Sequence, residues 1–169
     1  MIRVKYRYGI EEPMDISYEE MDVSGSDDAL RCTEQIISAL LTEPSSIVLD
    51  FADIHYIVTG ATVYVGSGKA EGANKYEKAS QAAMDDLALK TNINEVRYFL
   101  ATVGSSDVKA DEIKDIITFL SNKINIDAEF ILGTTGKTNL GNEVEISIIA
   151  ALKNKRPVET PQFLHENQS

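Results

Sequence analysis

The sequence predicts an α/β fold, a two-layer domain in which helices pack on a mixed sheet. From residue 61 onward, segments with the alternating pattern of strands are interleaved with segments at helical spacing, and the series closes on two successive strands. The 169 residues, 43% of them hydrophobic and 25% charged, suffice for one domain with its own core. A helix and a short strand pair are predicted ahead of this domain.

The N-terminal part reads as two short strands followed by a helix. Apolar residues alternate at positions 2 to 8 and again at 16 to 18, on either side of a turn marked by Gly9 and Pro13. Residues 28 to 41 carry apolar side chains at helical spacing, directly after a run of helix-capping residues. We therefore expect a strand pair and then an amphipathic helix.

The central part contains two helices, a strand and a glycine-rich segment. A short helix from Phe51 to about Val58 follows an acidic segment, residues 61 to 65 form a strand, and residues 74 to 89 form a long helix. Because glycines commonly mark turns, Gly66-Ser67-Gly68 and Gly72 are expected to form a loop between the strand and the long helix.

The last third alternates strand and helix before closing on a hairpin. Residues 96 to 103 read as a buried strand, and residues 111 to 124 form the clearest helix of the chain. Residues 129 to 134 and 143 to 152 read as two strands joined by a turn rich in Gly, Thr and Asn. The helix is identified by five apolar residues on one face: Ile113, Ile116, Ile117, Leu120 and Ile124.

Charge and composition exclude several classes of function. The net charge of −11 disfavours binding to nucleic acid and to anionic membranes. Cys32 is the only cysteine, and His55 and His165 lie far apart, so neither a disulfide framework nor a histidine zinc site is expected. The longest apolar stretch, residues 146 to 152, is far shorter than the roughly 18 residues of a spanning helix. We expect a cytoplasmic protein that does not insert into membranes.

Two glycine-containing segments only superficially resemble phosphate-binding loops. Residues 66 to 72 have wrongly spaced glycines, and Glu71 would place a carboxylate where a phosphate should lie. Residues 133 to 138 end in Gly-Lys-Thr, but the segment that follows alternates like a strand and offers no helix N-terminus. No catalytic triad or metal-ligand spacing is visible either. The sequence therefore predicts no cofactor, no metal and no enzyme activity of the chain by itself.

A series of short segments in a fixed order indicates a protein family more specifically than any of the motifs above. An acidic segment, a glycine pair and a closing hairpin follow one another at characteristic spacings. These segments are Leu49-Asp50-Phe51-Ala52-Asp53-Ile54, Gly66-Ser67-Gly68, Ala70-Glu71-Gly72, Gly133-Thr134, Leu140-Gly141-Asn142-Glu143 and Ile148-Ile149-Ala150. From about residue 27 to 152 the chain resembles the C-terminal (activation) domain of bacterial and archaeal FtsZ, in the FtsZ/tubulin superfamily.

The resemblance implies three parts and a role for the acidic segment. It divides the chain into an N-terminal extension (1–26), an FtsZ C-terminal-domain-like module (27–152) and a flexible tail (153–169). The family's GTPase domain has no counterpart, so the chain is expected to be GTPase-deficient. In FtsZ polymers the acidic loop of one subunit enters the nucleotide pocket of the next, which implies that Asp50, Phe51 and Asp53 bind a partner and that the carboxylates act there in trans. The family has an asparagine where Val48 stands.

The two aspartates also have a purely structural interpretation. Asp50 could cap a helix that begins at Phe51, and Asp53 would be favoured in its first turn by the helix dipole. The residue types alone favour capping, and the surrounding resemblance favours a docking loop. Both interpretations stay open at this stage.

The tail contains a second short resemblance. Residues 159 to 168 include Pro161, Phe163 and Leu164, and this pattern is similar to the terminal peptide of bacterial FtsZ. That peptide binds membrane-tethering and regulatory partners in the family. Two apolar residues on a polar tail suit docking into a partner groove. His165 replaces the family's arginine.

The extension over residues 1–26 matches no segment of the family. Loss of the nucleotide domain would uncover the apolar side of the helix at 28–41, and either the N-terminal strands or a homodimer would have to cover it. Four hypotheses of function follow. The chain docks onto an FtsZ-type polymerising GTPase and modulates its filaments, it self-associates as a structural protein, it is a small-molecule enzyme or sensor on a reused scaffold, or it is a fragment that has lost its function.

Overall fold

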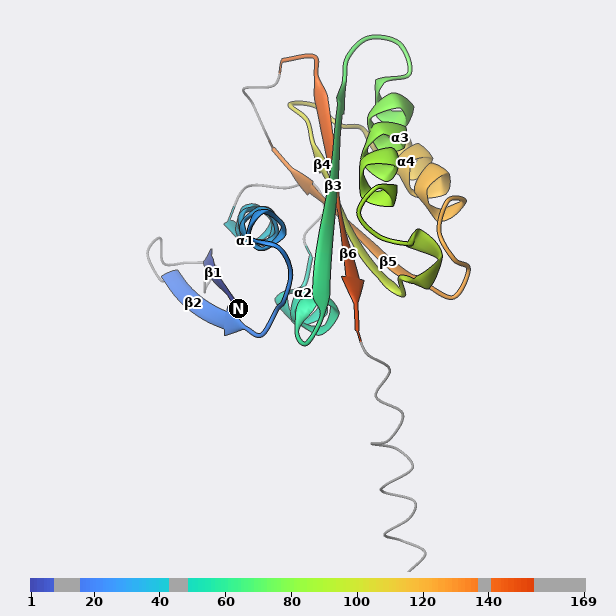
Figure 1. Ribbon diagram of the computed structural model, residues 1–169. Coiled ribbons are helices and arrows are strands. Elements are labelled where there is room, and N and C mark those ends of the chain that lie inside the picture. The colour runs from blue at the N-terminus through green and yellow to red at the C-terminus, as the bar shows by residue number, and fades with distance from the viewer. Residues whose placement is uncertain (8–15, 43–48, 137–140, 154–169) are drawn as a thin grey trace, which may run out of the picture.

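A computed structural model describes residues 1–7, 16–42, 49–136 and 141–153 of the chain. These residues form a mixed α/β fold with two separate sheets and four α-helices (Figure 1). In chain order the elements are β1 (Ile2–Arg7), β2 (Ile16–Met21), α1 (Asp27–Thr42), α2 (Phe51–Val58), β3 (Thr62–Ala70), α3 (Lys75–Ala88), the 3₁₀-helix η1 (Ile93–Glu95), β4 (Tyr98–Gly104), α4 (Ala110–Ser121), β5 (Glu129–Thr135) and β6 (Val144–Leu152).

The main sheet has four strands in the order β3-β6-β4-β5. Strand β6 is antiparallel to both of its neighbours, whereas β4 and β5 are parallel and are connected through α4. The register of β3 on β6 runs from Thr62 opposite Leu152 to Ala70 opposite Val144. The mixed sheet with packed helices that the sequence predicts is confirmed.

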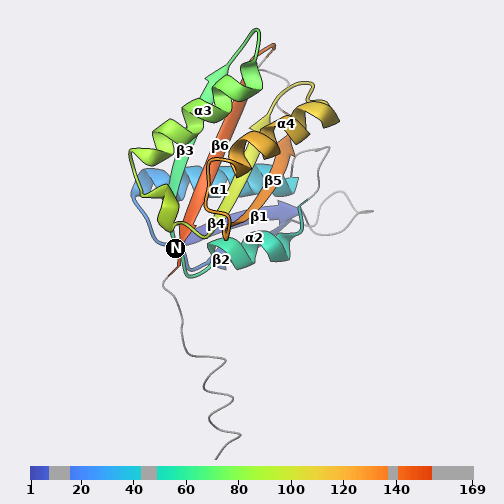
Figure 2. The ribbon, with the colours of Figure 1, turned by 90° about the vertical axis from the view of Figure 1, so that its right-hand side faces the viewer.

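Each face of the main sheet carries its own hydrophobic core. Helices α3 and α4 cover one face, where Phe99, Leu87 and Leu120 are fully buried. Helices α1 and α2 lie on the opposite face together with the β1–β2 hairpin, and Ile37, Ile54 and Leu100 are buried there. Figure 2 shows α3 and α4 in front of the sheet and α1 with the hairpin behind it. The N-terminal elements thus add a further layer to the two that the sequence predicts.

The β1–β2 hairpin packs on α1 and is not hydrogen-bonded into the main sheet as a strand pair. Its apolar residues Ile2, Val4 and Met21 are at most 2% exposed and belong to the same core as Ile37 and Leu40 of α1. Of the two covers that the sequence suggests for the apolar side of this helix, the described structure contains the N-terminal strands.

The expected loop at Gly66-Ser67-Gly68 is wrong, because these residues lie in the middle of β3. A side chain on either glycine would collide with the backbone of α3. A Cβ atom on Gly66 would lie 2.3 Å from the carbonyl oxygen of Ala83, and one on Gly68 would lie 2.3 Å from that of Ala79. The glycines therefore serve close packing of a helix on a strand, and the strand continues to Ala70.

The predicted pairing of the last two strands as a hairpin is wrong, because β5 pairs with β4, whereas β6 lies between β3 and β4. The bounds of the other elements agree with the sequence predictions to within a few residues. Helix α2 has the predicted bounds, and α4 ends three residues before Ile124. Strand β4 begins two residues later than predicted, after η1. No helix within the described part of the chain is long and apolar enough to cross a membrane. The predicted tail over residues 153–169 lies outside the described residues except for Lys153.

Candidate functional site

The candidate site is the N-terminal end of α2, where Asp50 and Asp53 lie. Asp50 is the N-cap of the helix, and its Oδ1 accepts a hydrogen bond from the backbone N–H of Ala52 at 3.0 Å. Its carbonyl oxygen accepts from the N–H groups of Asp53 and Ile54 at 3.1 and 3.2 Å. The capping interpretation of Asp50 therefore holds, and it also fixes where the carboxylate is presented.

Both aspartate side chains are exposed on the surface. The carboxylate of Asp53 makes no hydrogen bond or ion pair with any residue that the structure describes, and Asp50 uses one oxygen for the cap. Asp53 occupies the first turn, where the helix dipole favours a negative charge. Two carboxylates three positions apart therefore project from one helix end. Oδ2 of Asp50 and both oxygens of Asp53 accept no hydrogen bond from a residue that the structure describes.

Helix α2 is held rigidly by its opposite face. Ile54, Ile57 and Val58 are at most 2% exposed and pack in the core shared with α1 and the main sheet. Phe51 is partly buried against the same core, and its ring lies 5.8 Å from the ring of His55. Phe51 is thus an anchor of the helix, and its predicted contact with a partner stays a prediction.

A cluster that sequence reasoning missed ties the other end of α2 to the sheet. The hydroxyls of Tyr56 and Tyr98 are 3.3 Å apart, and their rings meet edge to face at 5.7 Å. The ammonium of Lys153 lies 4.6 Å from the ring centre of Tyr56 and 5.1 Å from that of Tyr98, and it donates to the carbonyl oxygen of Tyr56. Such contacts combine cation–π attraction with a favourable charge near a helix C-terminus.

The phenol of Tyr98 stays protonated at neutral pH. The hydrogen bond with Tyr56, together with burial, raises the pKa of Tyr98 to about 12. No sequence pattern reveals this cluster, because its members come from α2, from β4 and from the residue after β6. Only the fold brings them together.

The site is an acidic helix end and does not enclose a small molecule. A cavity of about 520 Å³ lies between α3 and α4, and one of about 150 Å³ lies between α1 and the main sheet. Neither cavity is lined by Asp50 or Asp53. Within the described residues no group of three or more His, Cys, Asp or Glu side chains could hold a metal ion. An exposed acidic end suits docking to another macromolecule better than catalysis in an enclosed pocket.

Several predicted residues cannot be placed. Pro161, Phe163 and Leu164 of the tail, and Val48 before the acidic segment, lie outside the described residues. The structure therefore places three of the six predicted binding residues, Asp50, Phe51 and Asp53, at one helix end.

The capping role of Asp50 gives a first testable prediction. We expect Asp50→Ala to lower the free energy of unfolding by about 1 kcal/mol, because the N–H of Ala52 loses its acceptor. Asp50→Asn should leave the stability nearly unchanged, since an asparagine side chain caps helices equally well. Urea denaturation followed by circular dichroism measures both. Equal stability of the alanine and asparagine variants would contradict the capping role.

Comparison with known proteins places the fold. Residues 60–152 match the family model of the FtsZ family, C-terminal domain. The chain is 30% identical over 125 residues to the mitochondrial division protein fszA of Dictyostelium discoideum, covering 73% of this chain and 24% of that protein. It is 27% identical over 114 residues to the cell division protein FtsZ 1 of Thermococcus kodakarensis, covering 67% of this chain and 31% of that protein. The chain thus spans 24% and 31% of the lengths of these two relatives.

Solved structures show the same fold at lower identity. An empty FtsZ dimer of M. jannaschii superposes with a TM-score of 0.63 at 20% identity, over 73% of this chain and 38% of that one. A helical model of a four-stranded TubZ-Bt filament superposes with a TM-score of 0.57 at 14% identity, over 84% of this chain and 38% of that one. Both matches extend beyond residues 60–152 of this chain.

Proposed function

The chain belongs to the FtsZ family through its C-terminal domain, and on this premise we propose that it is a protein-binding module for FtsZ-type polymers. It docks through the acidic end of α2 onto the GTP-bearing face of an FtsZ-type subunit and modulates the filament there. The module corresponds to residues 27–152, with residues 1–26 as an extension. The chain contributes no GTP hydrolysis of its own.

The presentation of Asp50 and Asp53 supports this proposal most strongly. Two exposed carboxylates project from the end of a helix whose other face is fixed by Ile54 and Ile57 in the core. The fold needs one oxygen of Asp50 for the cap, while the carboxylate of Asp53 has no partner among the residues described. A rigid acidic group of this kind is preorganised for a partner, because little side-chain and backbone freedom is lost on binding.

Carboxylates in this position suit a role beside a partner's nucleotide. A carboxylate accepts a proton or a hydrogen bond from a water molecule and so orients that water toward a phosphate. We propose that Asp50 and Asp53 reach the nucleotide of the docked subunit and change its rate of hydrolysis in trans. Two structural neighbours are described as a dimer and as a four-stranded filament, and these descriptions support a role in assembly.

The tail adds a second proposed contact. Pro161, Phe163 and Leu164 lie outside the described residues, in a segment that is otherwise polar. Apolar side chains in an otherwise polar segment bind grooves of partner proteins. We propose that this segment binds a membrane-tethering protein while the module contacts the polymer.

A pelleting assay with an FtsZ-type GTPase from the same cell tests whether the acidic end of α2 is the docking site. We expect the chain, added at substoichiometric ratios with GTP, to reduce the amount of pelleted polymer and to change phosphate release. The double variant Asp50→Asn/Asp53→Asn keeps a capping side chain but loses both charges. We expect the concentration for a half-maximal effect to rise at least about tenfold, which corresponds to about 1.4 kcal/mol of binding free energy.

A matched control separates this site from general charge effects. Asp27→Asn/Asp28→Asn makes the same charge change at two exposed residues in the first turn of α1, and this variant should pellet like the unmodified chain. If both double variants weaken the effect equally, the acidic end of α2 has no special role. If the unmodified chain changes neither pelleting nor phosphate release up to equimolar ratios, the proposed function is wrong.

A further inference from the structure

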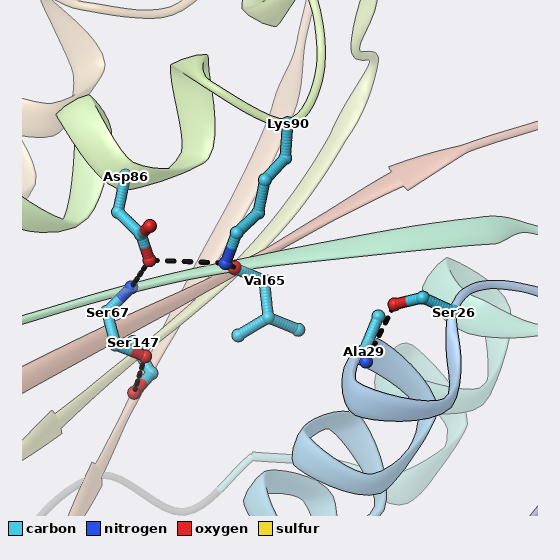
Figure 3. A network of polar contacts seen from close by, with 7 residues as sticks. All are labelled: Ser26, Ala29, Val65, Ser67, Asp86, Lys90 and Ser147. Carbon is cyan, nitrogen blue, oxygen red and sulfur yellow. Dashed lines mark hydrogen bonds and ion pairs between the residues drawn. The ribbon is translucent and has the colours of Figure 1, made fainter.

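The outer edge of β3 offers little to a partner, because the chain itself closes it. The ammonium of Lys90 donates to the carbonyl oxygen of Val65 at 2.6 Å, and the N–H of Ser67 donates to Oδ2 of Asp86 at 3.0 Å (Figure 3). Lys90 and Asp86 also form an ion pair at 3.3 Å. At the start of this edge, Ser24 forms a parallel bridge with the first residue of β3. The outer face of α2 is open by comparison.

The exposed face of α2 continues from its acidic end to Tyr56. Ala52, Asp53 and Tyr56 are exposed, whereas Ile54 and Ile57 are buried on the opposite face. Asp53 and Tyr56 are three positions apart, so they lie on one side of the helix, about 4.5 Å apart along its axis. Tyr56 is therefore a neighbour of the carboxylates onto which a partner is proposed to dock.

A partner seated on the acidic end of α2 would cover Tyr56 as well. A specific protein–protein interface buries about 800 Å² on each partner, which corresponds to a patch about 30 Å across. Helix α2 has 8 residues and is about 12 Å long. The acidic end and Tyr56 therefore fall within one interface of this size.

Tyr56 has the properties of a residue that contributes strongly to binding. It is 55% exposed, and tyrosine is enriched among the residues that supply most of the binding free energy of interfaces. Its ring meets that of Tyr98 edge to face, and the ammonium of Lys153 lies 4.6 Å from its ring centre. Lys153 also donates to the carbonyl oxygen of Tyr56. An exposed ring that is held by two neighbours loses little conformational freedom when a partner covers it.

We propose that Tyr56 is a binding residue of the same docking site, and that its ring enters an apolar depression on the FtsZ-type subunit beside the groups that face Asp50 and Asp53. Tyr98 and Lys153 are positioning residues, which hold the ring of Tyr56 in place. This inference rests on the proposed function, from which it takes the partner and the acidic end. It assigns affinity to Tyr56 and leaves the effect on the partner's nucleotide to the two carboxylates.

Titration of a Tyr56 variant in the same pelleting and phosphate-release assays tests this division of roles. We expect Tyr56→Ala to raise the concentration for a half-maximal effect at least about tenfold. The change in phosphate release at saturation should stay that of the unmodified chain, because both carboxylates remain. Alanine favours helices, and circular dichroism checks that the variant is folded.

Tyr18→Ala is the matched control. Tyr18 of β2 is 53% exposed, and it too lies under a cation, since the guanidinium of Arg3 is 4.7 Å from its ring centre. The variant loses an equally exposed aromatic ring from a different element and should titrate like the unmodified chain. An equal loss in the two variants would show that Tyr56 has no special role.

The positioning residues are tested by their dependence on Tyr56. Lys153→Met removes the ammonium and should raise the half-maximal concentration about threefold, whereas Lys153→Arg keeps a cation near the rings and should restore the unmodified value. Added to Tyr56→Ala, Lys153→Met should have no further effect, because the ring that it positions is gone. If the effects of the two substitutions multiply, Lys153 does not act through Tyr56.

The outcomes separate this inference from the proposed function. If Asp50→Asn/Asp53→Asn weakens the effect and folded Tyr56→Ala does not, the inference is overturned and the proposed function stands. If Tyr56→Ala weakens it and the aspartate variant does not, the acidic contact is wrong and the binding role of Tyr56 stands. If the unmodified chain changes neither pelleting nor phosphate release, both are overturned.

Discussion

Replacing Gly68 with valine is expected to lower the free energy of unfolding by about 3 kcal/mol or more. A Cβ at this position would lie 2.3 Å from the carbonyl oxygen of Ala79 and 2.6 Å from the backbone nitrogen of Ala83. Both atoms belong to the backbone of α3, so no side-chain rotation relieves the overlap. The helix would have to move off the strand and open the core around Leu87. Urea denaturation measured by circular dichroism gives the expected loss directly.

Ser67→Val is the matched control for this prediction. The two positions are adjacent in β3, but the side chain of Ser67 projects from the opposite face of the sheet and contacts the hydroxyl of Ser147 at 3.3 Å. Valine suits an exposed strand position, so the change should stay within about 1 kcal/mol. If Gly68→Val were as stable as Ser67→Val, the close approach of α3 would be wrong.

This pair of positions also shows where the sequence misleads. Glycine marks turns in most sequences, which is why Gly66-Ser67-Gly68 is predicted as a loop. Glycine also occurs where two backbones approach closely, and that is its role in β3. The small side chains Ala79 and Ala83 on the facing helix are the signal that could have distinguished the two cases, because they indicate a short helix-to-strand distance.

Elements with a strong hydrophobic period were predictable because their buried residues recur locally. Helix α4 is an example, with Ile113, Ile116 and Leu120 buried on the predicted face. The candidate site was predictable in part for the same reason. Asp50 and Asp53 are three residues apart, so their common helix end follows from local spacing.

Contacts between distant segments could not be predicted from spacing. Tyr56 and Tyr98 are separated by 42 positions, and Asp86 and Ser67 by 19. Only the order of strands in the sheet and the packing of the helices bring each pair together. The Tyr56–Tyr98–Lys153 cluster and the closed edge of β3 are therefore visible only in the folded chain.

The N-terminal strands cover the apolar side of α1, and a substitution that breaks this contact is expected to cause the second large loss of stability. Residues 1–26 lie outside the segment 60–152 that matches the FtsZ C-terminal domain, yet Val4 is fully buried and packs in one core with Ile37 of α1. The hairpin occupies the apolar side of α1 that a homodimer would otherwise have to cover. Self-association through this face would therefore require the hairpin to detach.

We expect Val4→Asp to lower the free energy of unfolding by about 3 to 5 kcal/mol, because it places an unpaired charge in the core between the hairpin and α1. Detachment of the hairpin would also expose Ile37 and Leu40, so the variant should bind the hydrophobic dye ANS at neutral pH. Tyr18→Asp introduces the same carboxylate at a residue of β2 that is 53% exposed, and it should change the stability by no more than about 1 kcal/mol. If the two variants were equally stable and neither bound the dye, the hairpin would not cover α1 in solution. The apolar face would then need another cover, and a homodimer through α1 would be the arrangement to test.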